Sequence, residues 1–315
     1  MNLTGDSKEN RVALIVGPTA SGKTEIALRT AGALRAEIVS ADSRQVYRYM
    51  DIGTAKPAPQ ERQRVPHHFI DIRDPDQYYS AGDYAREARE TITGLLARGV
   101  TPLVVGGSGF YLSALVDGLS APRFSDPAVK ARWRRRAARD GVQALHSELA
   151  RIDPEAAARL HPNDVQRVVR ALEVFELSGR PLSDFKAGEQ TPAGFTPVFF
   201  GLRRERADLV GRIDRRADLM LEAGLLDEVR RLAQRGWGPE LNALRSVGYR
   251  EVFQYLEGGI GYGEMVEAIR LNTRRYAKRQ MTWFRREPRI RWIDLGERSA
   301  LQAASELLAL WRESD

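Results

Sequence analysis

The chain of 315 residues contains no cysteine. This absence excludes disulfide bonds, zinc sites with cysteine ligands and thiol nucleophiles, and it suits a reducing compartment. The sequence also lacks the run of about 18 apolar residues that indicates a membrane-spanning helix. Its first residues, "MNLTGDSKENR", are too polar for a secretory signal. We therefore expect a protein of the cytoplasm without membrane association.

Histidine is scarce as well, with four residues in the chain. His67 and His68 are adjacent, and neither an acid nor a third histidine stands at a spacing typical of a transition-metal site. We interpret this pair as structural or as lining a substrate.

What the sequence has in excess is positive charge. Lysine and arginine number 49 against 42 aspartates and glutamates, which gives a net charge of +7 and an isoelectric point near 9.8. A basic surface suits a polyanionic partner such as nucleic acid. The other proportions, 43% hydrophobic and 29% charged residues, are typical of a globular protein.

Short apolar segments alternate with helical ones over residues 11–107. "RVALIVG", "AEIVSA" and "TPLVVGG" have the apolar bodies of buried strands, and "TEIALRTAGAL" and residues 81–98 are expected to be helices. "TPVFFGL" is expected to be a later strand of the same sheet. This order predicts an α/β fold, a parallel sheet flanked by helices, whose ligands bind beyond the carboxyl ends of the strands.

The pattern changes near Ser120. Residues 121–163 are charged, helix-rich and without a plausible strand, which predicts an all-helical insertion domain. Residues 1–120 and 164–315 would then form the α/β core with its C-terminal helices. A helix is expected to begin after Asn163 or Asp164 and to stop at Gly179.

A phosphate-binding loop directly follows the first strand. The segment matches the pattern G-x-x-x-x-G-K-[ST] between a strand and a helix, so the sheet is expected to be of the P-loop type. Glycines let backbone N–H groups surround a phosphate, lysine adds a charge, and Thr24 can hold Mg²⁺. The residues expected to bind phosphate are Gly17, Pro18, Thr19, Ala20, Ser21, Gly22, Lys23 and Thr24.

The acid that an ATPase carries at the end of a neighbouring apolar strand is missing. The candidate strand "PLVV" runs into Gly106, Gly107, Ser108 and Gly109 instead. This absence argues against plain ATP hydrolysis and leaves Asp42, beyond the second strand, as the carboxylate expected to face the phosphate. Asp42 could act in chemistry, cap the strand end or bind magnesium.

Several motifs occur in order from about residue 12 to about residue 292. They are "GPTASGKT", "SADSRQVY", "MDIGTAKP", "PHHFIDIRDP", "VVGGSGFYL", "HPNDVQRVVRALEVFELSGR", "SVGYRE" and "YAKRQMTWFRR". The set resembles the tRNA dimethylallyltransferase family, also called tRNA isopentenyltransferases, and "MDIGTAKP" beside "GPTASGKT" is specific to it. Most members have threonine at the position of Ser108, which keeps the hydroxyl, and some have a smaller residue than Arg44.

The resemblance implies transfer of the dimethylallyl group from dimethylallyl diphosphate to N6 of adenine 37, next to the anticodon, in tRNAs that read codons starting with U. Diphosphate is the leaving group, which suits a phosphate loop without machinery for a γ-phosphate. The substrates would be the tRNA anticodon stem-loop and dimethylallyl diphosphate, with Mg²⁺ as cofactor. We expect a monomer.

The same resemblance assigns roles to single residues. Asp42 would be the general base, and the other catalytic residues would be Lys23, Thr24, Ser108 and Arg216. The diphosphate would be held by Arg216, with Arg212 as second choice. The positions expected to bind tRNA are Asp42, Ser43, Arg44, Gln45, Ser108, Lys130, Gln166, Arg167, Arg170, Gly248, Tyr249, Arg250, Lys278, Arg279, Gln280, Arg285 and Arg286.

Some of these basic residues also have simpler interpretations. Gln166, Arg167 and Arg170 lie opposite an apolar helix face, so they could be ordinary surface residues. The run "KARWRRRAAR", which includes Lys130, could likewise be an exposed helix face.

The arginines near residue 214 have an alternative too. Arg212 and Arg216 are four residues apart on one predicted helix face, and they could pair with Asp214 or Asp218 instead of a diphosphate. Aromatic residues of the last long helix, such as Tyr276, share a face with apolar residues and are expected in the core.

Three rival functions remain open from the sequence. A small-molecule kinase would also have the loop, the sheet and a helical insertion, but it should consume ATP. A nucleotide-gated RNA-binding protein would bind RNA without transferring a group. A prenyltransferase acting on free adenine nucleotides is the third, and the basic C-terminal region favours the polymeric substrate over it.

Overall fold

The computed structural model describes residues 10–119, 125–185 and 192–313. The chain forms two compact units, Met1–Val116 with Ala193–Asp315 and Asp117–Pro192. None of the helices in the described residues has both the length and the apolar character that crossing a bilayer requires.

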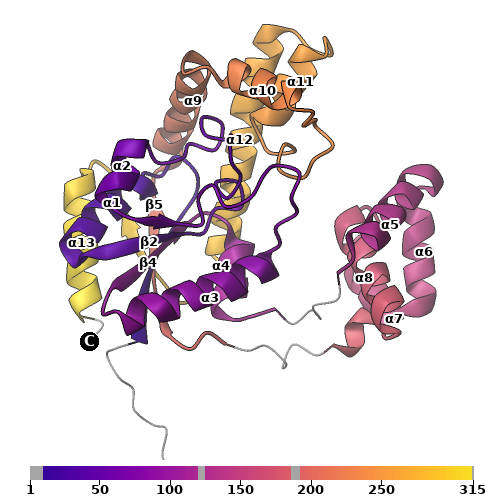
Figure 1. Cartoon of the computed structure of the whole chain (residues 1–315), viewed down its shortest axis with the longest axis horizontal. Helices are drawn as coiled ribbons and strands as arrows, with labels where there is room; N and C mark the ends of the chain where they lie inside the picture. The colour runs from indigo at the N-terminus through magenta and orange to yellow at the C-terminus, as the bar shows by residue number, and fades with distance from the viewer. Residues whose placement is uncertain (1–9, 120–124, 186–191, 314–315) are drawn as a thin grey trace, which may run out of the picture. The chain divides into compact units, whose positions relative to one another are not determined.

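The larger unit is built on a sheet that has six strands in the described residues (Figure 1). They are β1 (Arg11–Val16), β2 (Ala36–Ser40), β3 (His67–His68), β4 (Thr101–Gly106), β5 (Thr196–Arg203) and β6 (Ile290–Asp294). Their order is β3-β2-β4-β1-β5-β6, and every neighbouring pair is parallel. The predicted P-loop-type parallel sheet is therefore confirmed. β3 and β6 escaped prediction because neither has the continuous apolar run of the inner strands.

Helices cover both faces of this sheet. The apolar residues of β1 alternate between the two sides: Ala13 and Ile15 pack into one cluster with α1 and α13, and Val12 and Leu14 are equally buried. Figure 1 shows α1 and α13 side by side, whereas α3 packs against α4. The helices of this unit are α1 (Lys23–Leu34), α2 (Pro59–Arg64), α3 (Ala81–Ala97), α4 (Gly109–Val116), α9 (Arg206–Glu222), α10 (Leu225–Gln234), α11 (Tyr249–Leu256), α12 (Tyr262–Phe284) and α13 (Ala300–Glu313).

Ion pairs join α9 to α12. Arg274 donates hydrogen bonds to the carboxylate of Asp214, one of them 2.8 Å long, and Arg270 donates to Asp218 over 2.5 Å. These are the two aspartates that the sequence offered as partners for arginines of α9. Because arginines of α12 pair with Asp214 and Asp218, Arg212 and Arg216 of α9 can make other contacts.

The smaller unit is helical in its described residues. It contains α5 (Pro127–Asp140), α6 (Val142–Ile152), α7 (Pro154–Arg159), α8 (Val165–Ser178) and a short 3₁₀ helix, η2 (Leu182–Asp184). Its core is a single cluster of buried side chains that includes Trp133, Leu145, Leu149 and Leu172.

Helix α8 belongs to this helical unit, whereas the predicted insertion ended at residue 163. The apolar face of α8 packs against α5 and α6. An apolar stripe shows that a helix is buried, but it does not show which neighbour covers it. The ends of α8 were predicted correctly: the Asp164 carboxylate accepts a hydrogen bond from the backbone N–H of Arg167, and Gly179 has the left-handed conformation.

Gly106 at the end of β4 offers a test of how closely the strand ends approach. A Cβ atom at this position would lie 2.2 Å from the carbonyl oxygen of Ala41. We expect Gly106→Ala to lower the free energy of unfolding by about 1–3 kcal/mol, because backbone atoms would have to move apart. Denaturation with urea measures this change.

Gly94 provides the matched control. It is exposed on α3, and nothing lies within 4 Å of a Cβ atom added there. Gly94→Ala should raise the free energy of unfolding by up to about 1 kcal/mol, because alanine favours the helix. An unchanged stability of Gly106→Ala would contradict the close approach of these strand ends.

Candidate active site

The phosphate loop follows β1 in a conformation that requires glycine. Gly17 has a φ of +152°, and a Cβ atom there would lie 2.7 Å from the carbonyl oxygen of Leu202. Gly22, just before α1, has a φ of +100°. Nζ of Lys23 donates hydrogen bonds to the carbonyl oxygens of Gly17, 2.9 Å away, and Pro18, 2.6 Å away. The lysine therefore lies over the loop, where a bound phosphate would meet it.

Three arginine side chains contact this loop. The contacts are Arg204 Nε to Ser21 O at 3.0 Å, Arg212 Nε to Ala20 O at 2.9 Å, and Arg216 Nη1 to Thr19 Oγ1 at 3.5 Å. Both predicted arginines therefore contact the loop, and a third one joins them. Arg204 was missed, although the sequence held a signal for it: it directly follows β5, which lies next to β1 in the sheet.

Asp42, Lys23 and Arg216 interact electrostatically. Burial of the ammonium group, and then the nearby Arg216 guanidinium, lower the pKa of Lys23 to about 7, while the Asp42 carboxylate acts in the opposite direction. Burial likewise lowers the pKa of Arg216, again opposed by Asp42. For Arg212, burial and then Arg204 are the main causes of a lowered pKa. Asp42 and two of the predicted cations, Lys23 and Arg216, are thus brought together in one site. The Asp42 carboxylate affects the pKa of Arg216, whereas it is not among the main causes of the shift of Arg212.

The Asp42 carboxylate is oriented by the turn that follows β2. Its Oδ1 accepts hydrogen bonds from the backbone N–H groups of Arg44, over 2.8 Å, and Gln45, over 3.4 Å. Ser108, at the end of β4, accepts a hydrogen bond from the Ser43 N–H over 3.0 Å. The loops after β2 and β4 therefore meet at the carboxyl edge of the sheet. Asp42 therefore caps its own turn, and its carboxylate also interacts electrostatically with Lys23 of the phosphate loop.

Two side chains of α12 extend into this site in ways that the sequence did not indicate. Gln280, expected to contact tRNA, is buried: its Oε1 accepts from the Thr19 N–H and its Nε2 donates to Gly107 O, each over 2.8 Å. Tyr276, expected in the core, interacts electrostatically with Asp42. Burial of the hydroxyl, and then the Asp42 carboxylate, raise the pKa of Tyr276 to about 12. α12 thus links the phosphate loop to the loop after β4.

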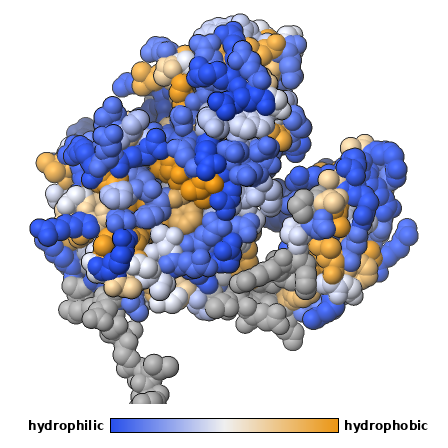
Figure 2. Space-filling model, in the orientation of Figure 1, coloured by the Kyte–Doolittle hydropathy of each residue, from blue (hydrophilic) through white to orange (hydrophobic). Residues whose placement is uncertain are grey.

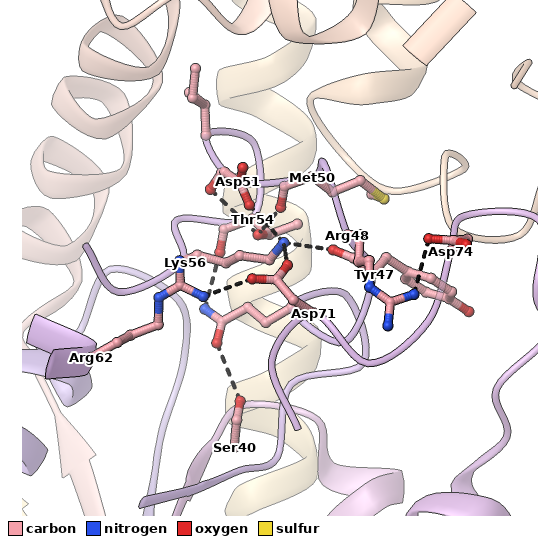
Figure 3. Close-up of polar contacts among 12 residues, drawn as sticks. Ser40, Tyr47, Arg48, Met50, Asp51, Thr54, Lys56, Arg62, Asp71 and Asp74 are labelled. Carbon is pink, nitrogen blue, oxygen red and sulfur yellow. Dashed lines mark hydrogen bonds and ion pairs between the residues drawn. The ribbon is translucent and has the colours of Figure 1, made fainter. Parts of the chain in front are cut away.

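The segment after Asp42 is held by a polar network (Figure 3). Gln45 accepts a hydrogen bond from Ser40 and donates to Thr54 O and Ala55 O, each of these two over 3.3 Å. Gln45 was expected to bind tRNA, but its amide group is occupied within the loop.

Lys56 is the centre of the same network. Its buried Nζ donates to Tyr47 O over 2.6 Å, to Asp51 over 2.7 Å and to Asp71 over 2.5 Å, and Arg62 also bonds to Asp71. Figure 3 shows Lys56 and Arg62 both pointing at the Asp71 carboxylate. The lysine of the motif "MDIGTAKP", Lys56, therefore stabilises the folded conformation of this loop.

Glu228 anchors the start of that motif from α10. Its carboxylate accepts hydrogen bonds from the N–H groups of Asp51, Ile52 and Gly53 over 2.8–3.1 Å, and from the Tyr249 hydroxyl over 2.6 Å. The Tyr249 side chain, expected at a tRNA contact, is fully buried by this arrangement. Glu228 was missed because a single acid on a charged helix carries no signal of burial.

Apart from Gly248, which is buried, the remaining predicted RNA contacts of the larger unit are exposed or half-buried. Arg44 donates to Asn242 O over 2.7 Å, and Arg250 bonds to Glu251 over 2.6 Å. In the helical unit, Gln166 and Arg167 are exposed. Arg170 bonds to buried Glu173, and Lys130 is half-buried. The exposed basic residues of α12 and the turn after it include the four predicted ones, Lys278, Arg279, Arg285 and Arg286.

A pocket of about 450 Å³ opens beside Arg216. Its wall is largely apolar, with Ile52, Ala55, Leu219 and Met220 among the lining residues. The pocket therefore has an apolar wall next to Arg216, the α9 residue that contacts the phosphate loop.

The described residues offer few protein ligands for a metal ion at this site. The described residues contain no group of three or more histidine or acidic side chains that could hold a metal ion. Thr24, in the first turn of α1, is half-buried and offers a hydroxyl beside the loop. Such a site fits Mg²⁺, which commonly takes one or two protein ligands and completes its shell with phosphate oxygens and water.

Lys23 should couple anion binding to proton uptake. With a pKa of about 7 it is partly neutral in the free protein, and a bound diphosphate raises that pKa. The complex therefore holds more protons than the free protein above pH 7, and affinity falls as the pH rises beyond the free pKa. Calorimetric titration with inorganic diphosphate at about pH 8, in buffers of different ionisation enthalpy, should report proton uptake.

Lys23→Arg is the control, because arginine keeps the charge but does not titrate in this range. The variant should take up fewer protons than the wild type, which separates Lys23 from the titration of diphosphate itself. Equal uptake by the two proteins would contradict the lowered pKa of Lys23.

Comparison with known proteins identifies a family for the chain. The family model for IPP transferase matches residues 45–287. The tRNA dimethylallyltransferase of Geobacter sulfurreducens is 47% identical over 91% of this chain and 92% of its own length. That of Carboxydothermus hydrogenoformans is 44% identical over 95% of this chain and 96% of its own length.

Solved structures agree as well. The full-length tRNA isopentenylpyrophosphate transferase from Bacillus halodurans is similar with a TM-score of 0.71 and 38% identity, covering 97% of this chain and 98% of that one. A eukaryotic dimethylallyltransferase acting on tRNA is similar with a TM-score of 0.80 and 28% identity, covering 96% and 78%. The chain therefore belongs to the tRNA dimethylallyltransferase family of prenyltransferases.

Proposed function

We propose that this protein transfers the dimethylallyl group from dimethylallyl diphosphate to N6 of adenine 37 in tRNAs that read codons starting with U. Its relatives are named for transfer of this group to tRNA. The observation that carries the proposal is the shared site of Asp42, Lys23 and Arg216, where an acid and two cations influence one another. A base and a leaving-group cradle at one place are what this transfer needs.

The cations suit the departing diphosphate. The bond between the first carbon of the dimethylallyl group and the diphosphate oxygen breaks, so negative charge develops on that oxygen. Lys23, Arg216 and N–H groups of the loop would stabilise that charge, and such electrostatic stabilisation is the largest single contribution in many enzymes. Arg212, which donates a hydrogen bond to the carbonyl oxygen of Ala20 in the middle of the loop, would add further positive charge there.

The acid suits the nucleophile. The lone pair of adenine N6 is delocalised into the ring, so N6 is a poor nucleophile until it loses a proton. As the bond from N6 to carbon forms, the Asp42 carboxylate would accept that proton. General-base help of this kind is worth about 10²–10⁴ in rate. The turn that holds Oδ1 through the Arg44 N–H fixes the direction of the carboxylate.

The pocket beside Arg216 suits the donor. Its apolar wall, with Ile52, Leu219 and Met220, can accept the branched hydrocarbon, while Arg216 faces the diphosphate end. Mg²⁺ held by Thr24 and the diphosphate oxygens would neutralise part of the phosphate charge when bound. A pocket that has an apolar wall and a cation beside it fits a prenyl diphosphate.

The basic surface suits RNA. A base in a folded anticodon loop must leave its stack to reach Asp42, which costs a few kcal/mol. Exposed cations such as Lys278, Arg279 and Arg285 would contribute phosphate contacts that weaken as salt increases.

Asp42→Asn tests the role of the carboxylate more sharply than alanine does. The amide oxygen can still accept the N–H groups of Arg44 and Gln45, but asparagine cannot accept a proton. We expect the rate of transfer to fall about 10²- to 10⁴-fold. Single-turnover transfer from labelled dimethylallyl diphosphate to an anticodon stem-loop RNA measures this rate.

Binding of the same RNA, measured separately, serves as the control and should change little in Asp42→Asn. Transfer at the wild-type rate would remove Asp42 from the chemistry. ATP consumption by the wild type, with no release of diphosphate from the prenyl donor, would favour a kinase instead.

A further inference from the structure

An exposed aromatic pair lies beside the segment that carries Asp42. The rings of Tyr49 and Trp237 are 5.6 Å apart between centroids and tilted by 34°. The Arg235 guanidinium carbon lies 4.1 Å from the centroid of the Tyr49 ring and 5.7 Å from that of the Trp237 ring. Tyr49 is 42% exposed, and Trp237 is half-buried. These three side chains are called the aromatic platform below.

The backbone at Tyr49 is strained. Its φ is +65°, a left-handed value that bulky residues rarely adopt. Phe69 has the same φ, but its ring is buried and packs edge-on against Tyr84, so core packing offsets that strain. Tyr49 is 42% exposed, so core packing offsets less of the strain at this residue. Strained residues held at a surface are often part of a binding site.

The platform is joined to the catalytic turn on both sides. Tyr49 lies in the loop that begins at Asp42, and Trp237 lies in the connection between α10 and α11. Arg44, two residues after Asp42, donates to Asn242 O in that same connection over 2.7 Å. The Glu228 carboxylate of α10 holds the backbone just after Tyr49, at Asp51 and Ile52. The platform therefore sits on a loop pair whose geometry is fixed relative to Asp42.

The charge of the platform is positive. In the ranges that the structure describes, Arg235 forms no ion pair within 4.0 Å, and it is exposed. A cation above two aromatic faces attracts a partner that has both a flat π-surface and a negative charge. A nucleotide has both, because every base has a π-face and every linkage carries a phosphate.

We propose that Tyr49, Trp237 and Arg235 form a stacking platform for a nucleobase of the RNA substrate, next to the adenine that enters the site. This rests on the proposed function, since it requires an RNA with a reactive base at Asp42. The rings would hold the neighbouring base outside the loop stack, and Arg235 would contact that base or its phosphate. Stacking would then offset part of the cost of extruding the target base.

The test uses stem-loop RNAs in which 2-aminopurine replaces one base at a time beside the target adenine. Stacking on an aromatic side chain changes the fluorescence of 2-aminopurine. With the full-length wild-type protein we expect this change at one neighbouring position, and we expect its loss in Trp237→Ala and in Tyr49→Gly. Both variants should bind the unlabelled stem-loop about 5- to 150-fold more weakly, the range for loss of one stacked base.

The variants separate stacking from folding. Glycine adopts a φ of +65° without strain, so Tyr49→Gly removes the ring while keeping the loop. Tyr49→Phe keeps the ring and should retain the affinity. Because stacking does not release counterions, Trp237→Ala should keep the wild-type slope of affinity against salt. Tyr262→Ala is the matched control, because Tyr262 is a similarly exposed aromatic residue, 51%, paired with Tyr255.

Failure of the stacking platform can be distinguished from failure of the proposed transfer reaction. If the wild type transfers no dimethylallyl group, the proposed function fails whatever the fluorescence shows. If it transfers the group, but Trp237→Ala and Tyr49→Gly bind RNA as the wild type does, the platform is overturned. A dimer of the wild type that Trp237→Ala abolishes, with unchanged RNA binding, would make the patch an interface between copies and also overturn it.

Discussion

The structure depends on one concentration of opposite charges at the carboxyl edge of the sheet. Lys23 and Arg216 repel each other and are both partly buried, so each is less favourable as a cation than it would be in water. Asp42 opposes that effect for both. A diphosphate would do the same more strongly, so the free site is arranged to gain from an anion. The proposed diphosphate binding and the position of the Asp42 carboxylate would therefore depend on the same cluster of charges.

Distant parts of the larger unit hold this charge cluster in place. α12 supplies Gln280, which bonds to both the phosphate loop and the loop after β4, and α9 supplies Arg216. Ion pairs then join α9 to α12. On the other side, Lys56 and Glu228 fix the loop that begins at Asp42. Each support lies far along the chain from the group that it positions.

The sequence was sufficient for those features that local patterns determine. The phosphate loop, the inner strands and the ends of α8 follow from apolar runs, glycine spacing and capping residues, and the structure has them where they were predicted. That Asp42 faces the loop followed from strand order, since carboxyl ends of parallel strands share one edge. Resemblance added Arg212 and Arg216, and both contact the loop.

Local patterns could not show which polar side chains the fold itself uses. Gln45, Gln280 and Tyr249 were expected to bind RNA, yet each is bonded inside the protein, because a hydrogen-bonding group looks the same in sequence whether its partner is RNA or backbone. The membership of α8 in the helical unit was missed for a related reason: the apolar face of a helix does not show which element packs against it. Long-range contacts decide all of these cases.

We propose that the Asp42 carboxylate and the phosphate loop act in one reaction. The most direct measurement is the mass of an anticodon stem-loop RNA after incubation with this protein and dimethylallyl diphosphate, together with the diphosphate released. We expect the RNA mass to increase by one dimethylallyl group, with release of an equal amount of diphosphate and no need for ATP. An unchanged RNA mass, or a product that forms only with ATP, would contradict it.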